Sequence, residues 1–318
     1  MTPPSPSGTP SQPPRRAAAP RGGRTASRQP HVTYLAIALC LAVFLGLAAA
    51  RVPDTWEALK KWGAPSPIDV WDGAYWGLLT SVFMHRALWH LAFNVYWLWV
   101  LGSWLEVTLG SVRYAVFFLS AAVVSSAAQL AVSGDTGIGA SGVGYAIFGF
   151  VWIASRRYPQ FREVLTPQMV QLFLYWLVGC MVLTYLNLWQ VGNAAHLSGL
   201  LFGAATAACF VVKYKPRLIL AALGVLIAVS LVPVFWCPWS VTWLDLRAQR
   251  AYEAGDFQRT VSYCNQAIRL DPGAGWLYYN RGAAYHRLGE FDKANADLDH
   301  AAQLDPTLKP REKQTPRK

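Results

Sequence analysis

A series of long apolar segments constrains the fold of this chain more than any other feature. Residues 32–50 carry no charged side chain, and six further apolar segments follow. Since about 20 apolar residues span the ~30 Å hydrocarbon core of a bilayer, these segments predict transmembrane helices. The composition agrees, because 54% of the residues are hydrophobic and only 14% are charged. We expect spans at residues 32–50, 87–105, 114–132, 141–154, 169–186, 194–212 and 218–236.

The fourth segment, residues 141–154, is too short to cross the hydrocarbon core. With a rise of ~1.5 Å per residue, its helix is about 21 Å long. A helix that begins at Ser141 therefore begins below the membrane surface. Irregular backbone at that depth is tolerated only inside protein or along a water-filled cavity. The sequence thus predicts a cavity at Ser141.

The net charge of +11 raises the question of a nucleic-acid partner. The basic residues do not form one stripe, because they are spread over the N-terminal region, short loops and the C-terminal region. This distribution is typical of the positive-inside rule, so we expect no nucleic-acid partner. The same rule places loops 133–140 and 187–193, which lack Lys and Arg, on the outer side. The Ser141 cavity then opens outward.

The two ends of the chain and its cysteines carry no site. Residues 1–31 are rich in Pro, Ser, Gly and Arg, so we expect a disordered, basic cytoplasmic tail, and residues 309–318 form a second basic tail. The five cysteines have no CxxC spacing, which argues against a metal site and against a disulfide framework. We expect no metal and no cofactor.

A repeat follows the seventh span and its linker, residues 213–240. Gly255-Asp256-Phe257 recurs as Gly289-Glu290-Phe291, and Leu270-Asp271-Pro272 recurs as Leu304-Asp305-Pro306, both after 34 residues. This pattern resembles the tetratricopeptide repeat, with units at 241–274 and 275–308. Two units are fewer than the roughly three that such arrays need for stability. We therefore expect the module to lean on the membrane domain or to self-associate, and to bind a protein partner.

Polar residues inside the apolar segments are the candidate functional groups, because such residues are costly in a membrane. His90 and Asn94 lie four residues apart and share one face of the second span. Ser141 begins the fourth span, and His196 lies near the start of the sixth. These three spans cross the membrane in the same direction, so the groups meet at a similar depth.

Each of these groups has a role in nucleophilic catalysis. A serine hydroxyl needs a base within hydrogen-bond reach, which His196 supplies to Ser141. Donors must already point at the oxyanion, and the His90 and Asn94 side chains can provide them. The backbone N–H groups of Ala140 and Ser141, at the N-terminus of a helix, would add to these.

The surrounding residues complete the expected site. No Asp or Glu lies in the fourth or sixth span, so a full triad is missing, and Tyr145 is expected to pack on the imidazole instead. Gly139 and Gly142 allow close approach of backbone and substrate. Gly199 and Gly203 form a small-residue face that would bring the sixth span against the fourth.

Each cluster taken alone has a simpler explanation. A serine in a glycine-rich helix is usually a packing residue, and His196 alone would equally fit a hydrogen bond between helices. The His90–Asn94 pair alone would fit an interhelical contact or a cofactor ligand. Together these explanations require three independent coincidences at one depth, so the catalytic interpretation is favoured.

The combination resembles the rhomboid family of intramembrane serine proteases over residues 32–212. The motifs that carry the resemblance are Gly139-Ala140-Ser141-Gly142 with Tyr145, His90 with Asn94, Ala195-His196 with Gly199 and Gly203, and Gly102, Glu106, Gly110 and Arg113 after the second span. The resemblance implies a Ser141/His196 dyad, with His90 and Asn94 holding the oxyanion. It also implies a structural rather than catalytic role for His85, and loop-organising roles for Glu106 and Arg113.

The first loop departs from the family pattern at one place. Where the family has a Trp-Arg pair, this chain has Trp76-Gly77, which puts the anchoring of that loop in question. The seventh span resembles the six-plus-one arrangement of some family members.

We therefore expect an all-α, multi-pass membrane protein with a six-helix core, a seventh transmembrane helix and a small helical-repeat module. Its expected activity is endopeptidase cleavage of transmembrane protein substrates in the lipid bilayer of a prokaryotic plasma membrane. A first alternative is an inactive rhomboid-like protein that binds transmembrane helices. A second is a small-molecule transporter, which would predict internal repeats across the spans, and none is visible.

Overall fold

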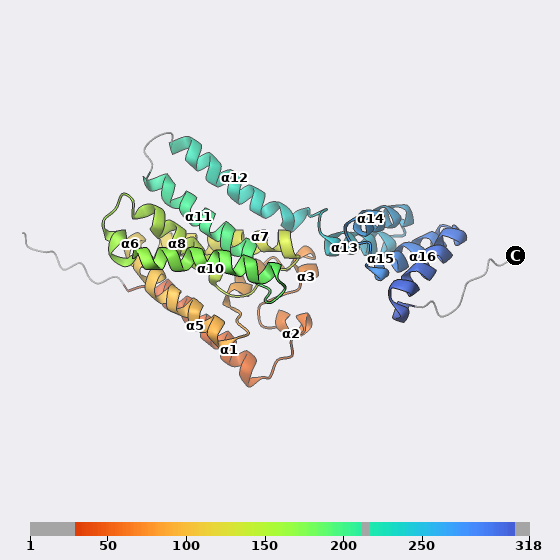
Figure 1. The fold of residues 1–318 in the computed structure, drawn as a ribbon, viewed down its shortest axis with the longest axis horizontal. Helices are drawn as coiled ribbons and strands as arrows, with labels where there is room; N and C mark the ends of the chain where they lie inside the picture. The colour runs from red at the N-terminus through yellow and green to blue at the C-terminus, as the bar shows by residue number, and fades with distance from the viewer. Residues whose placement is uncertain (1–28, 212–215, 309–318) are drawn as a thin grey trace, which may run out of the picture.

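The computed structural model describes residues 29–211 and 216–308. Over these residues the chain folds into helices, and no strand is present among them. Residues 1–28 of the tail expected at 1–31, the tail expected at 309–318, and residues 212–215 lie outside the described residues. Figure 1 shows a bundle of long helices with a smaller helical module beyond one end.

Within the described residues, five helices are long and apolar enough to cross a membrane. They are α1 (His31–Ala49), α7 (Ser111–Ser133), α10 (Pro167–Tyr185), α11 (Asn193–Val211) and α12 (Pro216–Phe235). The fourth predicted span is the shorter α8 (Ser141–Ala154), which begins at Ser141 as expected. These helices confirm the predicted multi-pass architecture.

The second predicted span is one long helical segment with an irregular centre. It consists of α5 (Leu88–Trp97), the π-helical η2 (Leu98–Gly102) and α6 (Ser103–Leu109). The π-helical turn was not predicted, because its residues have the same apolar composition as the helix around it. A Cβ at Gly102 would lie 2.7 Å from the Tyr114 hydroxyl, so the segment passes directly over α7.

Helix α8 lies at the centre of the membrane domain. Ten of its residues are buried, which suits a helix that is apolar on all sides. It packs most closely on α11, where a Cβ at Gly199 would lie 2.1 Å from the Gly142 carbonyl oxygen. A Cβ at Gly203 would lie 1.8 Å from the Ala146 carbonyl oxygen. The predicted small-residue contact between the fourth and sixth spans is therefore confirmed.

The buried carboxylate of Glu106 fixes the start of α1. It accepts hydrogen bonds from the Val32 and Thr33 backbone N–H groups, at 3.0 and 2.8 Å, and from the Thr33 hydroxyl. The Ser111 hydroxyl donates to Glu106 Oε1, which also accepts from Val32, at 2.6 Å. Glu106 thus joins α1, α6 and α7, whereas Arg113 is exposed to the surroundings.

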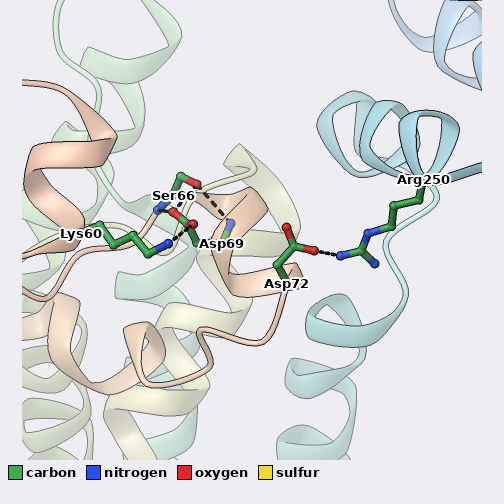
Figure 2. A network of polar contacts seen from close by, with 5 residues as sticks. All are labelled: Lys60, Ser66, Asp69, Asp72 and Arg250. Atoms are coloured by element: carbon green, nitrogen blue, oxygen red, sulfur yellow. Dashed lines mark hydrogen bonds and ion pairs between the residues drawn. The ribbon is translucent and has the colours of Figure 1, made fainter. Parts of the chain in front are cut away.

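The first loop forms four short helices. They are α2 (Trp56–Lys60), α3 (Pro67–Trp71), α4 (Gly77–Thr80) and the 3-10 turn η1 (Ser81–Phe83). A capping box starts α3, because Ser66 accepts from the Asp69 N–H and Asp69 accepts from the Ser66 N–H. Lys60 adds an ion pair to Asp69 at 2.5 Å, as Figure 2 shows.

The C-terminal module consists of two helical hairpins. They are formed by α13 (Val241–Glu253) with α14 (Phe257–Leu270), and α15 (Gly275–Arg287) with α16 (Phe291–Leu304), followed by the turn η3 (Pro306–Leu308). Gly255 and Gly289 lie in the turns of the two hairpins, with φ of +77° and +79°. This conformation favours glycine and explains the recurring Gly of the repeat.

In the membrane domain, one short helix, α9 (Gln160–Val164), connects α8 to α10.

Candidate active site

Ser141 and His196 meet where α8 and α11 begin. The His196 Nε2 atom lies 2.8 Å from the Ser141 Oγ atom, and His196 is buried. Ser141 is the first residue of α8 and His196 lies in the first turn of α11. The glycine contacts along these helices fix their separation, so two residues 55 positions apart in sequence come within hydrogen-bond distance.

The protonation of His196 follows from its partners. For Nε2 to accept the Ser141 hydroxyl, the neutral ring must carry its proton on Nδ1. Among the residues that the structure describes, none accepts a hydrogen bond from that Nδ1 atom. The imidazole therefore has no orienting carboxylate, in line with the sequence of α8 and α11.

Tyr145 holds the imidazole by contact instead. Its ring centroid lies 4.7 Å from that of His196, with 31° between the ring planes. The Tyr145 hydroxyl donates to the Phe173 carbonyl oxygen at 2.9 Å, which ties α8 to α10. Tyr145 is thereby fixed at both ends, and its ring limits the rotation of His196.

His90 and Asn94 face the loop that leads to the serine. A Cβ at Gly139 would lie 2.5 Å from His90 Cε1 and 3.4 Å from Asn94 Nδ2, so only glycine fits there. The φ of Gly139, +100°, also favours glycine. The Asn94 side-chain nitrogen donates to His85 Nε2 and to the His90 carbonyl oxygen, both at 3.1 Å. Both N–H bonds of the amide are thus engaged.

His85 connects the two halves of the site. Its Nδ1 lies 3.2 Å from the Phe83 carbonyl oxygen, which can only accept, so Nδ1 carries the proton and Nε2 is an acceptor. Nε2 accepts from Asn94 and, at 3.4 Å, from the Ala140 backbone N–H. The Ala140 N–H, expected to face the oxyanion, is therefore directed at His85. This bridging arrangement was not predicted, because nothing in the spacing of His85 shows which atoms it meets.

A cavity of about 840 Å³ lies over Ser141 and confirms the cavity predicted from the short α8. Gln129 of α7 lies in its wall, and its side-chain oxygen accepts from the Ala195 N–H at 3.1 Å. The Gln129 amide donates to the Ser133 hydroxyl at 2.9 Å. Gln129 was not singled out from the sequence, where a lone amide in a span gives no partner. Within the described residues, no group of three or more His, Cys, Asp or Glu side chains could hold a metal ion.

Two regions of the chain match known protein-family models. The rhomboid-domain family model matches residues 72–213, and the tetratricopeptide-repeat model matches residues 276–308. The chain therefore contains a rhomboid domain, followed by a tetratricopeptide repeat. This confirms the resemblance drawn from the motifs.

Curated relatives of this chain include rhomboid proteases of bacteria. The proteins named Rhomboid protease GlpG from Salmonella paratyphi A, Salmonella typhi and Salmonella newport are each 32% identical to it over 176 residues. The match covers 55% of this chain and 62% of each relative, so the chain spans less than two thirds of their length. With its apolar helices, the chain is an integral membrane protein of all-α fold.

Proposed function

We propose that this protein is a serine endopeptidase that cleaves membrane-protein substrates within the bilayer, with Ser141 as nucleophile and His196 as base. The observation that carries the proposal is the 2.8 Å contact between Ser141 Oγ and His196 Nε2 at the base of a cavity. A serine becomes a useful nucleophile only when a base can take its proton in this way. The bacterial rhomboid proteases that resemble the chain support the same activity.

The first step is attack of Ser141 Oγ on the scissile carbonyl carbon while its proton moves to His196 Nε2. The tetrahedral oxyanion then needs donors. Within the described residues, the His90 ring nitrogens make no hydrogen bond, so one can donate, and the Ser141 backbone N–H lies at a helix N-terminus. Asn94 joins them by exchanging its bond to the His90 carbonyl for one to the oxyanion.

The second half of the reaction returns the site to its resting state. His196 Nε2 gives the proton to the leaving amine nitrogen as the C–N bond breaks, which leaves an acyl ester on Ser141. Water then attacks the ester, and its proton passes to His196 Nε2. The ester bond to Ser141 breaks as His196 Nε2 gives that proton to Ser141 Oγ, which restores the hydroxyl and the neutral imidazole. The Tyr145 ring keeps the imidazole facing Ser141 throughout, in place of a carboxylate.

The substrate class follows from the position of the site. The cavity is reached beside loops 133–140 and 187–193, so the cut falls near the outer end of a substrate's transmembrane segment if these loops face outward. We propose a prokaryotic plasma membrane as the location, with the cavity open to the outer side. The repeat module is proposed to bind a protein partner.

Co-expression with a single-span model substrate tests the activity. Wild-type protein should release the cleaved fragment, while Ser141→Ala and His196→Ala should each lower the rate about a thousandfold or more. A fluorophosphonate probe should label the wild-type protein and not Ser141→Ala. Equal cleavage by all three proteins would reject the mechanism, and the absence of both labelling and cleavage in the wild-type protein would favour a protein that only binds transmembrane helices.

A further inference from the structure

A shared apolar core joins the repeat module to the membrane domain. Val70 and Trp71 of α3 are buried in one cluster with Leu130 of α7, Val234 of α12 and Leu244 of α13. Their exposed fractions lie between 0% and 7%. In Figure 1 the module accordingly lies next to α3 and the ends of α7 and α12. This contact explains how a module of only two repeat units can be stable.

At this junction, two indole N–H groups donate hydrogen bonds to carbonyl oxygens near the C-terminal ends of helices. The last carbonyl groups of a helix have no partner within the helix. Trp71 Nε1 donates to the Pro233 carbonyl oxygen of α12 at 3.0 Å. Trp239, in the linker after α12, donates to the Ala131 carbonyl oxygen of α7 at 2.8 Å. The first loop is thus bound to α12, and the linker is bound to α7.

Arg250 ties the module to the end of α3. Its guanidinium donates to the Trp71 carbonyl oxygen at 3.3 Å and forms an ion pair with the Asp72 carboxylate. Figure 2 shows Arg250 reaching from α13 to Asp72, with the Lys60–Asp69–Ser66 network on the other side of α3. One side chain of the module therefore satisfies both a terminal carbonyl and a charge of the first loop.

The same loop holds the segment that presents the nucleophile. The Gly139 N–H donates to the Ser81 carbonyl oxygen at 3.1 Å, two residues before Ser141. The Ser81 hydroxyl donates in turn to the Gly77 carbonyl oxygen at 2.6 Å, within α4 and η1. A continuous series of contacts therefore runs from Arg250 through α3, α4 and η1 to the serine loop.

The departure at Trp76-Gly77 fits this arrangement. A Cβ at Gly77 would lie 2.2 Å from Pro65 Cγ, so a side chain has no room at this position. An arginine there would not fit the loop as it is packed here. The contacts of Trp71 and Asp72 with α12 and α13 hold the loop from the other end.

We propose that α13 of the repeat module is a positioning element of the protease, which sets the first loop and through it the Gly139 segment that presents Ser141. Arg250, Asp72 and Trp71 are its positioning residues, and none of them touches the substrate. The inference rests on the proposed protease function. It makes the module a part of the working enzyme, so that a protein bound to the module can change the rate of cleavage through α3.

The expected loss of activity on breaking the Arg250–Asp72 ion pair follows from the exposure of the two side chains. The Arg250 and Asp72 side chains are 38% and 50% exposed, so their ion pair contributes little by itself, about 0.2–1 kcal/mol. A loss of that size corresponds to a change in kcat of about fivefold or less. Because the substrate does not contact these residues, KM should stay the same.

A charge swap tests the proposal. Arg250→Asp places two carboxylates face to face, and Asp72→Arg places two guanidinium groups face to face. Each single variant should lower kcat, by about twofold to fivefold, and raise hydrogen exchange in residues 56–83. The double variant Asp72→Arg with Arg250→Asp should restore both. As a matched control, the exposed Lys293–Glu290 pair of the same module is reversed in the same way and should change neither.

Trp71→Phe provides a second variant, which keeps an aromatic ring but removes the five-membered ring of the indole and with it the N–H donor to Pro233. It should lower kcat and leave KM unchanged. Wild-type kcat in both single charge variants and in Trp71→Phe would overturn the proposal, as would a loss that the swap does not restore. If the wild-type protein shows no Ser141-dependent cleavage, the proposed function fails. Hydrogen exchange in residues 56–83 then decides alone whether α13 positions the loop.

Discussion

The helix pair at the centre of the membrane domain and the helix pair at the end of the repeat module are built by different means. Between α8 and α11, backbones touch, because Gly199 and Gly203 leave no space for even a methyl group. Between α15 and α16 the approach is less close, because a Cβ at Gly282 would lie 3.1 Å from Leu298 Cγ and 3.2 Å from the Ala294 carbonyl oxygen.

The difference reflects the two solvents. In a bilayer, apolar side chains gain nothing by leaving the lipid, so helices associate through close van der Waals contact of small residues. In water, burial of apolar surface and paired charges hold the helices together. In the module, Arg281 of α15 makes a bidentate pair with Asp297 of α16, with both bonds at 2.7 Å. The α8–α11 pair should therefore tolerate no added side-chain volume. The α15–α16 pair should tolerate no loss of either charged side chain.

The largest effect is expected from volume added between α8 and α11. Gly203→Ala places a methyl group where the Ala146 carbonyl oxygen lies, so the helices must separate and Ser141 must move away from His196. The cost should reach or exceed the ~1–3 kcal/mol typical of overpacking, and cleavage should be lost. Thermal unfolding in detergent micelles and the substrate assay measure both effects.

The control for this change lies on α12. Gly224 has no atom within 4 Å of the position of a Cβ, so Gly224→Ala should leave cleavage intact. Since alanine is the better helix former by about 0.5–1 kcal/mol, stability should not fall. If Gly203→Ala behaved like Gly224→Ala, the account of backbone contact in the membrane domain would be wrong.

A smaller effect is expected from breaking the charge pair of the module. Arg281 and Asp297 are 19% and 11% exposed, and Arg281 also donates to the Asn265 side chain at 2.6 Å. Asp297→Ala leaves the guanidinium largely buried without its carboxylate, at a cost of about 2–3 kcal/mol, somewhat below the ~3–5 kcal/mol of a fully buried pair. Hydrogen exchange of α15 and α16 in the full chain should rise accordingly.

Asp292 offers the matched control on the same helix. Its side chain is exposed, so Asp292→Ala should change the hydrogen exchange of α15 and α16 by much less. Equal protection in Asp297→Ala and Asp292→Ala would mean that apolar burial alone holds this hairpin.

The smallest effect is expected in how the stability of the module depends on pH. Burial raises the pKa of the Asp245 carboxyl above its ordinary value of 3.8, although hydrogen bonds from Asn280 and Gln249 act the other way. A carboxyl with a higher pKa in the folded state binds more protons there, so the free energy of unfolding falls as pH rises from about 3.8 through the folded-state pKa.

Asp245→Asn should remove this dependence. Protection of α13 and α15 from hydrogen exchange, corrected for the intrinsic rate at each pH, should decline with rising pH in wild-type protein and stay level in the variant. The same slope in both proteins would assign the pH dependence to another group.

Much of this fold could be predicted from local pattern. Uncharged runs predicted the spans, the length of residues 141–154 predicted the cavity at Ser141, and the offset between Gly255 and Gly289 predicted the two hairpins. These features depend on composition and spacing along one segment. The catalytic roles of Ser141 and His196 stay predictions until the substrate assay is done.

The unpredicted features all depend on contacts between distant segments. His85 meets Ala140 across 55 residues, Gln129 meets Ala195 across 66, and Arg250 meets Trp71 across 179. Periodicity carries no information about such pairs. The π-helical turn after Trp97 was missed because its residues have the same apolar composition as the helix on either side.

The contact between Trp71 and Pro233 also has a consequence for the order of assembly. The two residues are 162 positions apart, and the second belongs to α12, the last of the candidate membrane helices within the described residues. During synthesis, the first loop emerges before any of its partners in α12 and α13 exist. Its final contacts can form only when that last helix has entered the membrane and the module has folded. The segment that carries Ser141 therefore acquires its full support only after α12 and α13 have been synthesised, and a nascent chain that ends before them lacks it.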